Sequence, residues 1–389
     1  MPASEPCVIV GAGLAGSAAG ILLARGGMQP LLLERTATVA PRICGEFIST
    51  EGVQALAALG VDVHALGGQR TRKLRLASGN LRIEAELPFE AVGLSRCALD
   101  GALQQRAQDS GARLQRGQRV AIAQLATRDS PFTLQLGDGQ REGQKEGQLL
   151  TTPSLLLACG KTDLAPVARR PRKEPEPLVG WQLHLRLSPA QMLEMDGHVE
   201  VALFDHGYAG LQAVEGKRVN LCLLARRLPA GQAQPSLPAL LQTIRQSCPL
   251  LDERLQGATW GEAGEAPAQT IYRVPYGHLH QPSVDDPPGL WRLGDQAAVI
   301  PSFTGDGMAI ALHSAALAAE VLLDGGAPER YHRQLLQDVG GQVRRAHGLY
   351  RAGRSTVGRV ALLQLLRRWP SLLGMIAAMT RVPASALRL

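Results

Sequence analysis

Cysteine pairs, aromatic side chains and C-terminal acidic residues are all scarce in this sequence of 389 residues. No two cysteines form a CxxC pair, and none has a Cys/His spacing typical of zinc, so the sequence indicates no metal site and no disulfide framework. Unpaired thiols favour a reducing, cytoplasmic setting. Aromatic residues make up only 4% of the chain, which argues against a nucleic-acid-binding surface. The six cysteines are Cys7, Cys44, Cys97, Cys159, Cys222 and Cys248.

Positive charge is concentrated near the C-terminus. The net charge is +7, but residues 331–389 contain ten arginines and one acid, Asp338, so this segment alone carries +9. Within it, residues 358–379 mix aliphatic side chains with arginines, and the stretch between Arg368 and Arg381 is too short to span a bilayer. We expect basic helices that pack on a sheet and expose a basic face. A surface for an anionic membrane or an acidic carrier protein is the alternative.

A glycine-rich turn near the N-terminus lies between two short apolar runs. The run at residues 7–10 precedes Gly11-x-Gly13-x-x-Gly16, a helical pattern follows, and a second apolar run ends in Glu34. The first glycine allows a tight turn, the second lets the backbone approach a pyrophosphate, and the third lets helix and strand pack closely. The helix N-terminus offers N–H donors to phosphates, and Glu34 can accept from ribose hydroxyls. The pattern predicts a dinucleotide-binding unit; a turn that merely packs is the alternative.

A second glycine-rich loop occurs near residue 300. A strand-like run delivers Gly294 and Asp295, and Pro301-x-x-x-Gly305-x-Gly307 leads into a long helix of small residues. Asp295 suits the ribitol hydroxyls of a flavin nucleotide, and the backbone of residues 305–308 suits a flavin ring. Since an extended dinucleotide needs contacts far apart in sequence, the two motifs together favour FAD. The alternative for this loop is a structural turn.

The element pattern predicts an α/β fold: a Rossmann-type FAD-binding domain with an inserted sheet-rich substrate domain and a C-terminal helical segment. Helical patterns are expected at 50–60 and 95–111, with Ser95 as a helix cap. The expected parts are an FAD-binding βαβ unit with the flavin loop at 1–70, substrate-domain strands at 71–94, the FAD-binding domain continued at 95–165, the substrate domain at 178–280, the FAD-binding GD motif and its helix at 290–330, and basic C-terminal helices at 331–389.

Four stretches resemble the superfamily of FAD-dependent monooxygenases and geranylgeranyl reductases, which shares the para-hydroxybenzoate hydroxylase fold. They occur in the family's order across residues 6–325: GxGxxG with Glu34, SRCALDGALQQRA from Ser95, LLLACG at 155–160, and GDQAAVIPSFTGDGM at 294–308. The resemblance implies that Arg96 contacts the cofactor and that PRICGE at 41–46 passes beside the isoalloxazine ring. Reductase members carry Cys-Gly-Gly where this chain has Cys44-Gly45-Glu46.

The motifs and the resemblance together predict one set of FAD-binding residues. They are Gly11, Gly13, Leu14, Ala15, Gly16, Glu34, Arg35, Arg42, Cys44, Gly45, Arg96, Gly160, Gly294, Asp295, Pro301, Gly305, Asp306, Gly307 and Met308. A second complete GxGxxG is absent, so we expect no separate NAD(P)H domain of the disulfide-reductase type. NADPH, NADH or a separate flavin reductase would supply the electrons. The WxWxIP motif of flavin-dependent halogenases is also absent, so halogenation is not expected.

Four residues are candidates for a catalytic role: Cys44, Glu46, His206 and Tyr208. Cys44 would contact or tune the flavin ring, and Glu46 would act as a base or accept hydrogen bonds at the start of the next helix. His206 and Tyr208 follow a strand-like run, and a histidine can exchange a proton near neutral pH. A structural role is the alternative for each of them.

The sequence favours a monooxygenase that hydroxylates or epoxidises an apolar aromatic or polyketide-like small molecule through a flavin C4a-hydroperoxide. The substrate would lie between the two lobes. Cys44-Gly45 favours an alternative, a reductase that saturates a prenyl or other activated alkene. A carrier-docking flavoprotein that uses its basic helices is a third hypothesis.

Overall fold

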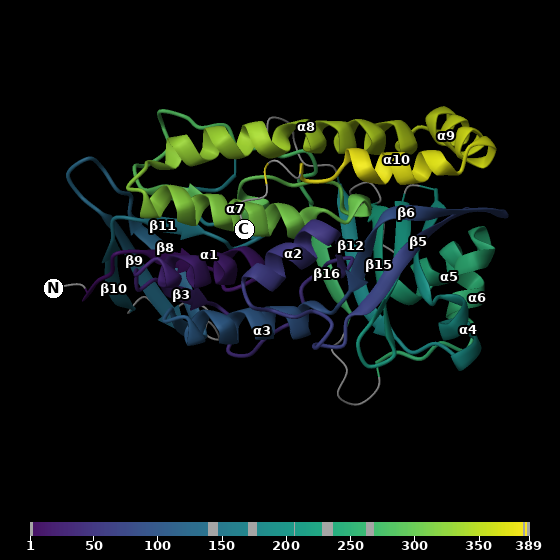
Figure 1. Cartoon of the computed structure of the whole chain (residues 1–389), viewed down its shortest axis with the longest axis horizontal. Coiled ribbons are helices and arrows are strands. Elements are labelled where there is room, and N and C mark those ends of the chain that lie inside the picture. Colours follow the sequence, from purple (N-terminus) through teal and green to yellow (C-terminus); the bar gives the residue numbers. More distant parts are fainter. Residues whose placement is uncertain are drawn as a thin grey trace.

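The computed structural model describes residues 3–138, 147–169, 177–205, 207–227, 236–261, 268–383 and 386 (Figure 1). His206, one of the predicted catalytic residues, lies outside these ranges. The described elements form a parallel sheet covered by helices, a small sheet, a large sheet and a C-terminal group of helices, and they confirm the predicted α/β fold (Figure 1).

A five-stranded parallel sheet forms the core of the N-terminal lobe. Its strand order is β17-β11-β2-β3-β7, with β17 at Leu290–Arg292, β11 at Leu155–Leu157, β2 at Val8–Val10, β3 at Leu31–Glu34 and β7 at Arg113–Arg116. The apolar runs of β2, β3 and β11 are buried on both faces, as expected for parallel strands with both faces covered.

Helices cover one face of this sheet, and a second sheet covers the other. Ile9 and Leu32 pack against the helices α1 (Leu14–Arg25), α3 (Arg96–Asp109) and α7 (Gly307–Leu323). Val8 and Leu31 point the other way, toward a four-stranded sheet in the order β1-β10-β9-β8. These strands span Ala3–Ser4, Gln148–Thr152, Phe132–Asp138 and Gln118–Gln124.

The second lobe is built on an eight-stranded sheet in the order β16-β12-β15-β14-β13-β5-β6-β4. Its strands run antiparallel except for the parallel pair β13 and β5. In that order they span Gln269–Tyr272, Leu178–Leu185, Arg218–Arg226, Gly207–Val214, Gly197–Phe204, Gln69–Ser78, Leu81–Gly93 and Phe47–Ile48. The edge strand β4 belongs to the segment after the predicted flavin loop, so this loop leads directly into the second lobe. A short helix, α2 (Thr50–Ala58), follows it, and Ser49 caps this helix.

The two faces of the large sheet have different coverings. The alternate residues Leu183, Leu221 and Ala202 pack under α4 (Pro189–Glu194), α5 (Leu237–Ser247) and α6 (Pro249–Leu255). On the opposite face, Leu76 and Ile83 pack under the C-terminal helices α9 (Thr356–Arg368) and α10 (Ser371–Met379). Figure 1 shows the sheet between these two groups of helices.

The long helix α8 (Pro328–Arg354) packs along α7 and leads to α9 and α10. The C-terminal segment therefore contains helices that pack on a sheet, as the sequence predicts. Among the described residues, no helix combines the length and apolarity needed to cross a bilayer.

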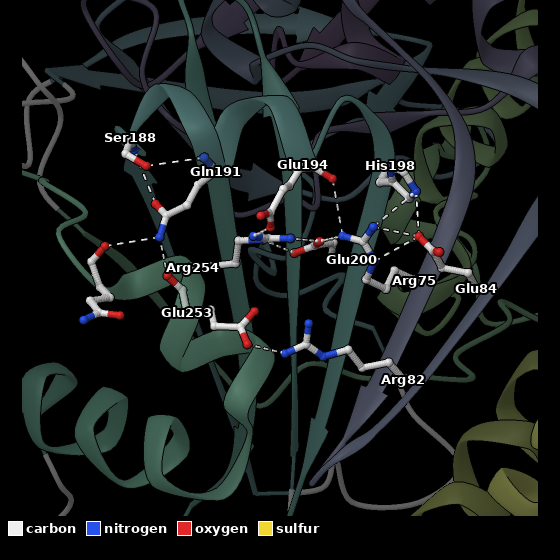
Figure 2. Close-up of polar contacts among 11 residues, drawn as sticks. Arg75, Arg82, Glu84, Ser188, Gln191, Glu194, His198, Glu200, Glu253 and Arg254 are labelled. Carbon is white, nitrogen blue, oxygen red and sulfur yellow. Dashed lines mark hydrogen bonds and ion pairs between the residues drawn. The ribbon is translucent and has the colours of Figure 1, made fainter.

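A network of charged residues connects α4 and α6 to the face of the large sheet that these helices cover (Figure 2). The buried carboxylate of Glu200 accepts hydrogen bonds from Arg254 at 3.0 and 2.9 Å and also from Arg75. Arg254 donates to Glu194 at 2.7 Å, and Arg75 donates to Glu84 at 2.7 Å. The network borders a cavity of about 380 Å³. Because the buried charges are paired and hydrogen-bonded, we interpret the network as a structural connection between layers.

Candidate functional site

The first glycine motif forms a tight turn that only glycine permits at two positions. Gly11 has a φ of +99°, and a Cβ there would lie 2.6 Å from the carbonyl oxygen of Ala158. A Cβ at Gly16 would lie 1.9 Å from the carbonyl oxygen of Gly11. Gly13 is the N-cap of α1, which has no side-chain cap and no acid in its first turn. The N-terminal N–H groups of α1, including those of Leu14 and Ala15, are thus suited to an anionic group.

Glu34 lies at the end of β3, beside this turn. The residue is 3% exposed, and its carboxylate accepts hydrogen bonds from the Ala12 N–H at 3.1 Å, from Thr36 and from Arg42 at 2.8 Å. Burial alone would raise the pKa of Glu34, but the Arg42 charge and the hydrogen bonds outweigh it and hold the pKa below its ordinary value. Glu34 is therefore ionised at neutral pH. The neighbouring Arg35 is exposed.

The second glycine motif meets the first in space. A Cβ at Gly294 would lie 3.3 Å from Cβ of Ala15 in α1, and the Gly294 N–H donates to Ser314 in α7 at 2.8 Å. Gly305 has a φ of +74°, and a Cβ there would lie 2.4 Å from the ring of Phe47. A Cβ at Gly307 would meet no atom within 4 Å. The N-termini of α1 and α7 are thereby brought together with open space beside the second loop.

The acids of the second motif have different surroundings. Asp295 pairs with Lys161 at 3.2 Å, next to Gly160, whose carbonyl accepts a hydrogen bond from Gln296. Asp306 is fully buried at the N-cap of α7, and burial raises its pKa well above the ordinary value. The Nε of Arg381 lies 3.6 Å from its carboxylate, beyond hydrogen-bond distance, so burial dominates the pKa shift of Asp306.

Two other predicted residues lie on the same loop and helix start. Pro301 precedes a short 3₁₀ turn, and Met308 is buried in α7.

Glu46 connects the predicted flavin loop to both lobes. It has a φ of +56°, an unusual conformation for a residue other than glycine, and it is 1% exposed. Its carboxylate accepts hydrogen bonds from the Arg96 N–H at 3.0 Å, from Gln182 at 2.9 Å and from His184 at 2.7 Å. Glu46 thus accepts a hydrogen bond from the first residue of α3. The sequence had suggested that it would accept hydrogen bonds at the start of the next helix, which is α2. It joins the loop to α3 and to strand β12.

Cys44 and Arg96 lie between the first glycine turn and the large sheet. The Arg96 guanidinium makes two hydrogen bonds to Asp100, at 3.0 and 2.9 Å, and lies 3.4 Å from a Cβ built at Gly13. Burial raises the pKa of the Cys44 thiol above its ordinary value, although the Arg96 charge opposes this shift. A Cβ at Gly45 would meet nothing within 4 Å. The loop therefore presents a protonated thiol and open space beside Arg96.

Three hydroxyl groups form a cluster at the second glycine loop, which contains Ser302. Ser302 lies 2.5 Å from the hydroxyl of Tyr276 and also hydrogen-bonds Tyr208, and the two tyrosine hydroxyls are 3.4 Å apart. Burial raises the pKa of both tyrosines above the ordinary value, so both keep their protons at neutral pH. The charge of Lys161 opposes the rise in pKa of both Cys44 and Tyr276.

Several residues of this site were not among the predicted site residues. Gln182 and His184 alternate with apolar residues in β12, and this period-two pattern of polar side chains in a buried strand was the available signal. Cys222 and Asn220 follow the same pattern in β15, where Asn220 donates to the carbonyl of Cys44 at 2.9 Å. Ser302 carried no distinguishing sequence signal.

Comparison with known proteins agrees with this geometry. Residues 5–144 match a family described as FAD binding domain. Over 380 residues the chain is 28% identical to menaquinone reductase of Mycobacterium tuberculosis (strain ATCC 25618 / H37Rv), which covers 94% of this chain and 85% of that protein. A stretch of 88 residues is 33% identical to squalene epoxidase erg1 of Schizosaccharomyces pombe (strain 972 / ATCC 24843), covering 22% of this chain and 19% of that protein. The structure of flavin-dependent brominase Bmp2 matches with a TM-score of 0.76 at 15% identity over 99% and 96% of the two chains, which shows a shared fold.

The chain is similar to the FAD-dependent monooxygenase and geranylgeranyl-reductase superfamily in its FAD binding domain, in its relatives and in its fold. It is an FAD-dependent oxidoreductase. The residues present fit the cofactor: the crowded glycine positions shape the turn, the uncapped start of α1 suits the pyrophosphate, and the open positions at Gly45 and Gly307 leave room beside the flavin loop. Glu34 and Arg96 would hold the nucleotide on either side of that turn.

Proposed function

We propose that this flavoprotein is a reductase that adds a hydride and a proton to a double bond of a prenylated, menaquinone-like substrate. The observation that carries the proposal is a set of groups that keep a proton at neutral pH: Cys44 on the predicted flavin loop, and the Tyr208, Tyr276 and Ser302 cluster at the second glycine loop. The similarity to menaquinone reductase over 94% of the chain supports the same reaction class. The proposal therefore prefers the reductase alternative of the sequence to the monooxygenase.

Reduction of a double bond needs a hydride, which carries both electrons, and a proton. Bound FAD, once reduced, supplies the hydride. The proton must come from a group that holds it at neutral pH and can release it to the substrate. Tyr208 meets the first requirement because burial raises its pKa, and its hydrogen bonds to Ser302 and Tyr276 can pass on a replacement proton. The electron donor, NADPH, NADH or a separate flavin reductase, is part of the proposal.

Glu46 has a positioning role in this proposal. Both oxygens of its carboxylate accept hydrogen bonds, Oε1 from the Arg96 N–H and Gln182 and Oε2 from His184, and its backbone N–H lies 3.4 Å from the sulfur of Cys44. Glu46 thereby fixes the thiol relative to β12 and α3. A free general base would need an open carboxylate oxygen near the substrate, so the base role suggested by the sequence has less support than the positioning role.

Anaerobic product analysis tests the proposal. The FAD-loaded chain, reduced with dithionite, would be mixed in the absence of oxygen with a short-chain menaquinol, whose ring is already reduced, and the product would be identified by mass spectrometry. The proposal expects a product with two additional hydrogen atoms. A product with one additional oxygen atom, formed only when oxygen is admitted, would contradict it.

A monooxygenase is the second candidate. The 88-residue similarity to a squalene epoxidase favours it, since epoxidation adds an oxygen atom to an apolar alkene. Hydroxylating or epoxidising activity on an apolar aromatic or polyketide-like compound would then require oxygen for every turnover. The anaerobic experiment separates the two reactions with a single substrate.

A further inference from the structure

We propose that helices α9 and α10 form a docking surface for an anionic lipid membrane. Six of the thirteen large apolar side chains that are exposed in the described residues lie between positions 357 and 379. Their exposed fractions are 82% for Val357, 51% for Val360, 43% for Leu365, 51% for Trp369, 57% for Met375 and 52% for Met379. An apolar group of this density on a protein surface indicates a binding partner.

The exposed residues form stripes opposite the packed faces of the helices. In α9, Leu363 and Leu366 pack against the large sheet, whereas Val357, Val360 and Leu365 are exposed. Positions 357, 360, 361, 364, 365 and 368 recur at helical spacing, so these exposed residues share one face. Met375 and Met379 are four positions apart in α10 and also share a face. Both helices therefore have one apolar face that is packed and a second that is open to solvent.

The positive charge of this surface indicates an anionic partner. Arg351, Arg354, Arg367 and Arg368 are exposed around the apolar stripes. The sequence contains no aspartate or glutamate from residue 339 to its C-terminus. Arginines beside exposed Val, Met and Trp side chains match an interfacial helix on an anionic bilayer, where Trp lies at the headgroup level. An uncharged apolar partner would offer these arginines no charge of opposite sign.

The same helices lie on the sheet face that carries the candidate active site. Directly opposed residues place Gln182, Cys222, Gly210, Val201, Leu76 and Ile83 in one row across β12, β15, β14, β13, β5 and β6. Opposed residues share a face of a sheet. Gln182 hydrogen-bonds Glu46 at one end of the row, and Ile83 packs with Leu363 and Leu366 at the other. The row spans about 24 Å, from five strand spacings of roughly 4.8 Å.

This arrangement places the docking surface and the flavin loop at opposite ends of one sheet face. A membrane held against α9 and α10 would lie at one end of the sheet face whose other end carries the flavin loop. Delivery of a lipid substrate along this face rests on the proposed function, whereas the docking itself rests on the exposure and charge of the two helices.

Vesicle binding tests the inference without any turnover. The FAD-loaded full chain would be centrifuged with vesicles of phosphatidylglycerol or of phosphatidylcholine at low and high salt. We expect binding to phosphatidylglycerol that salt weakens, and a loss of about fivefold in partitioning for each arginine removed in the Arg367→Gln and Arg368→Gln variants. Val360→Glu and Trp369→Glu should also lower binding, and Val284→Glu, at a fully exposed position elsewhere, should leave it unchanged.

Three outcomes would overturn the inference. The first is a wild-type chain that stays in solution with phosphatidylglycerol vesicles. The second is a dimer, detected by sedimentation, that Val360→Glu dissociates while vesicle binding is absent. The third is binding to an acidic carrier protein that the same variants abolish while vesicles are ignored. Activity on a soluble short-chain substrate would be unaffected in each case, so failure of the docking surface is distinguishable from failure of the proposed reaction.

Discussion

At the scale of single residues, glycines and one strained glutamate shape the candidate site. Gly11 and Gly16 bring the turn, α1 and strand β11 into contact that a Cβ would prevent. Glu46 adopts a φ of +56°, and its carboxylate accepts three hydrogen bonds from α3 and β12. The glycine spacing was readable in the sequence because each glycine has its own steric reason. The partners of Glu46 were not, since they lie 50, 136 and 138 residues away.

Replacement of the third glycine tests the turn. Gly16→Ala places a methyl group 1.9 Å from the Gly11 carbonyl oxygen, so the turn must open and its N–H groups must move. We expect the affinity for FAD, measured by equilibrium fluorescence titration, to fall about 100-fold, which corresponds to roughly 2.7 kcal/mol.

Gly101→Ala is the matched control for this substitution. Gly101 lies inside α3, where a Cβ would meet only Val39 at 3.8 Å, so alanine should leave the affinity for FAD unchanged and stabilise the helix slightly. Wild-type affinity in Gly16→Ala would show that the turn does not bind the pyrophosphate.

At the scale of elements, the sequence predicted the parts that depend on local pattern. The buried runs at β2, β3 and β11, the hairpin of β5 and β6, and the Ser95 cap of α3 all follow from periodicity and capping chemistry. Strand order is a different problem. The parallel pairing of β13 with β5 joins segments more than 100 residues apart, and β4 joins the large sheet from the flavin loop. No local pattern encodes such pairings, because they depend on which exposed edges meet during folding.

Gly210 provides a test at this scale. A Cβ there would meet only backbone atoms of the neighbouring strands, at 3.9 and 4.0 Å, so space remains above the sheet between the flavin loop and α9. If a prenyl chain lies along this face, Gly210→Leu should lower turnover of a long-chain substrate by about tenfold, a cost of roughly 1.4 kcal/mol. Turnover of a short-chain substrate should change little. The two rates would be measured by product formation under anaerobic conditions.

A glycine in another strand provides the control. Gly137 in β9 also has open space for a side chain, and this strand lies in the small sheet of the other lobe. Gly137→Leu should affect both substrates equally. An equal effect of Gly210→Leu on long and short chains would argue against this path for the substrate.

At the scale of the whole molecule, two buried histidines link stability to pH. Burial is the main cause that lowers the pKa of His278 to about 4 and that of His332 to about 3, from an ordinary value of 6.5. Nε2 of His332 accepts the Arg292 N–H at 3.1 Å, which fits the neutral ring. A histidine whose pKa is lowered in the folded state contributes its full stability at pH values above its ordinary pKa. This contribution is lost as the pH falls toward the folded-state pKa.

The free energy of unfolding should therefore decrease as the pH falls from about 6.5 to about 4. His278 alone would account for roughly 3 kcal/mol of this loss. Urea unfolding at several pH values would measure it. His278→Gln should flatten the dependence, and the same change at the exposed His64 should leave it as in the wild type. An identical pH dependence in His278→Gln would contradict the assignment.

The return of flavin colour without oxygen is the most direct test of the proposed reaction. The FAD-loaded chain would be bleached by dithionite under nitrogen, freed of excess reductant and mixed with a short-chain menaquinol, whose reduced ring leaves only the side-chain double bond to accept a hydride, while the visible absorbance is followed. We predict that the colour returns without oxygen, and that Tyr208→Phe slows this return by about tenfold or more because it removes a hydroxyl proton. Flavin that stays bleached until air is admitted would contradict the reductase and support an oxygenase.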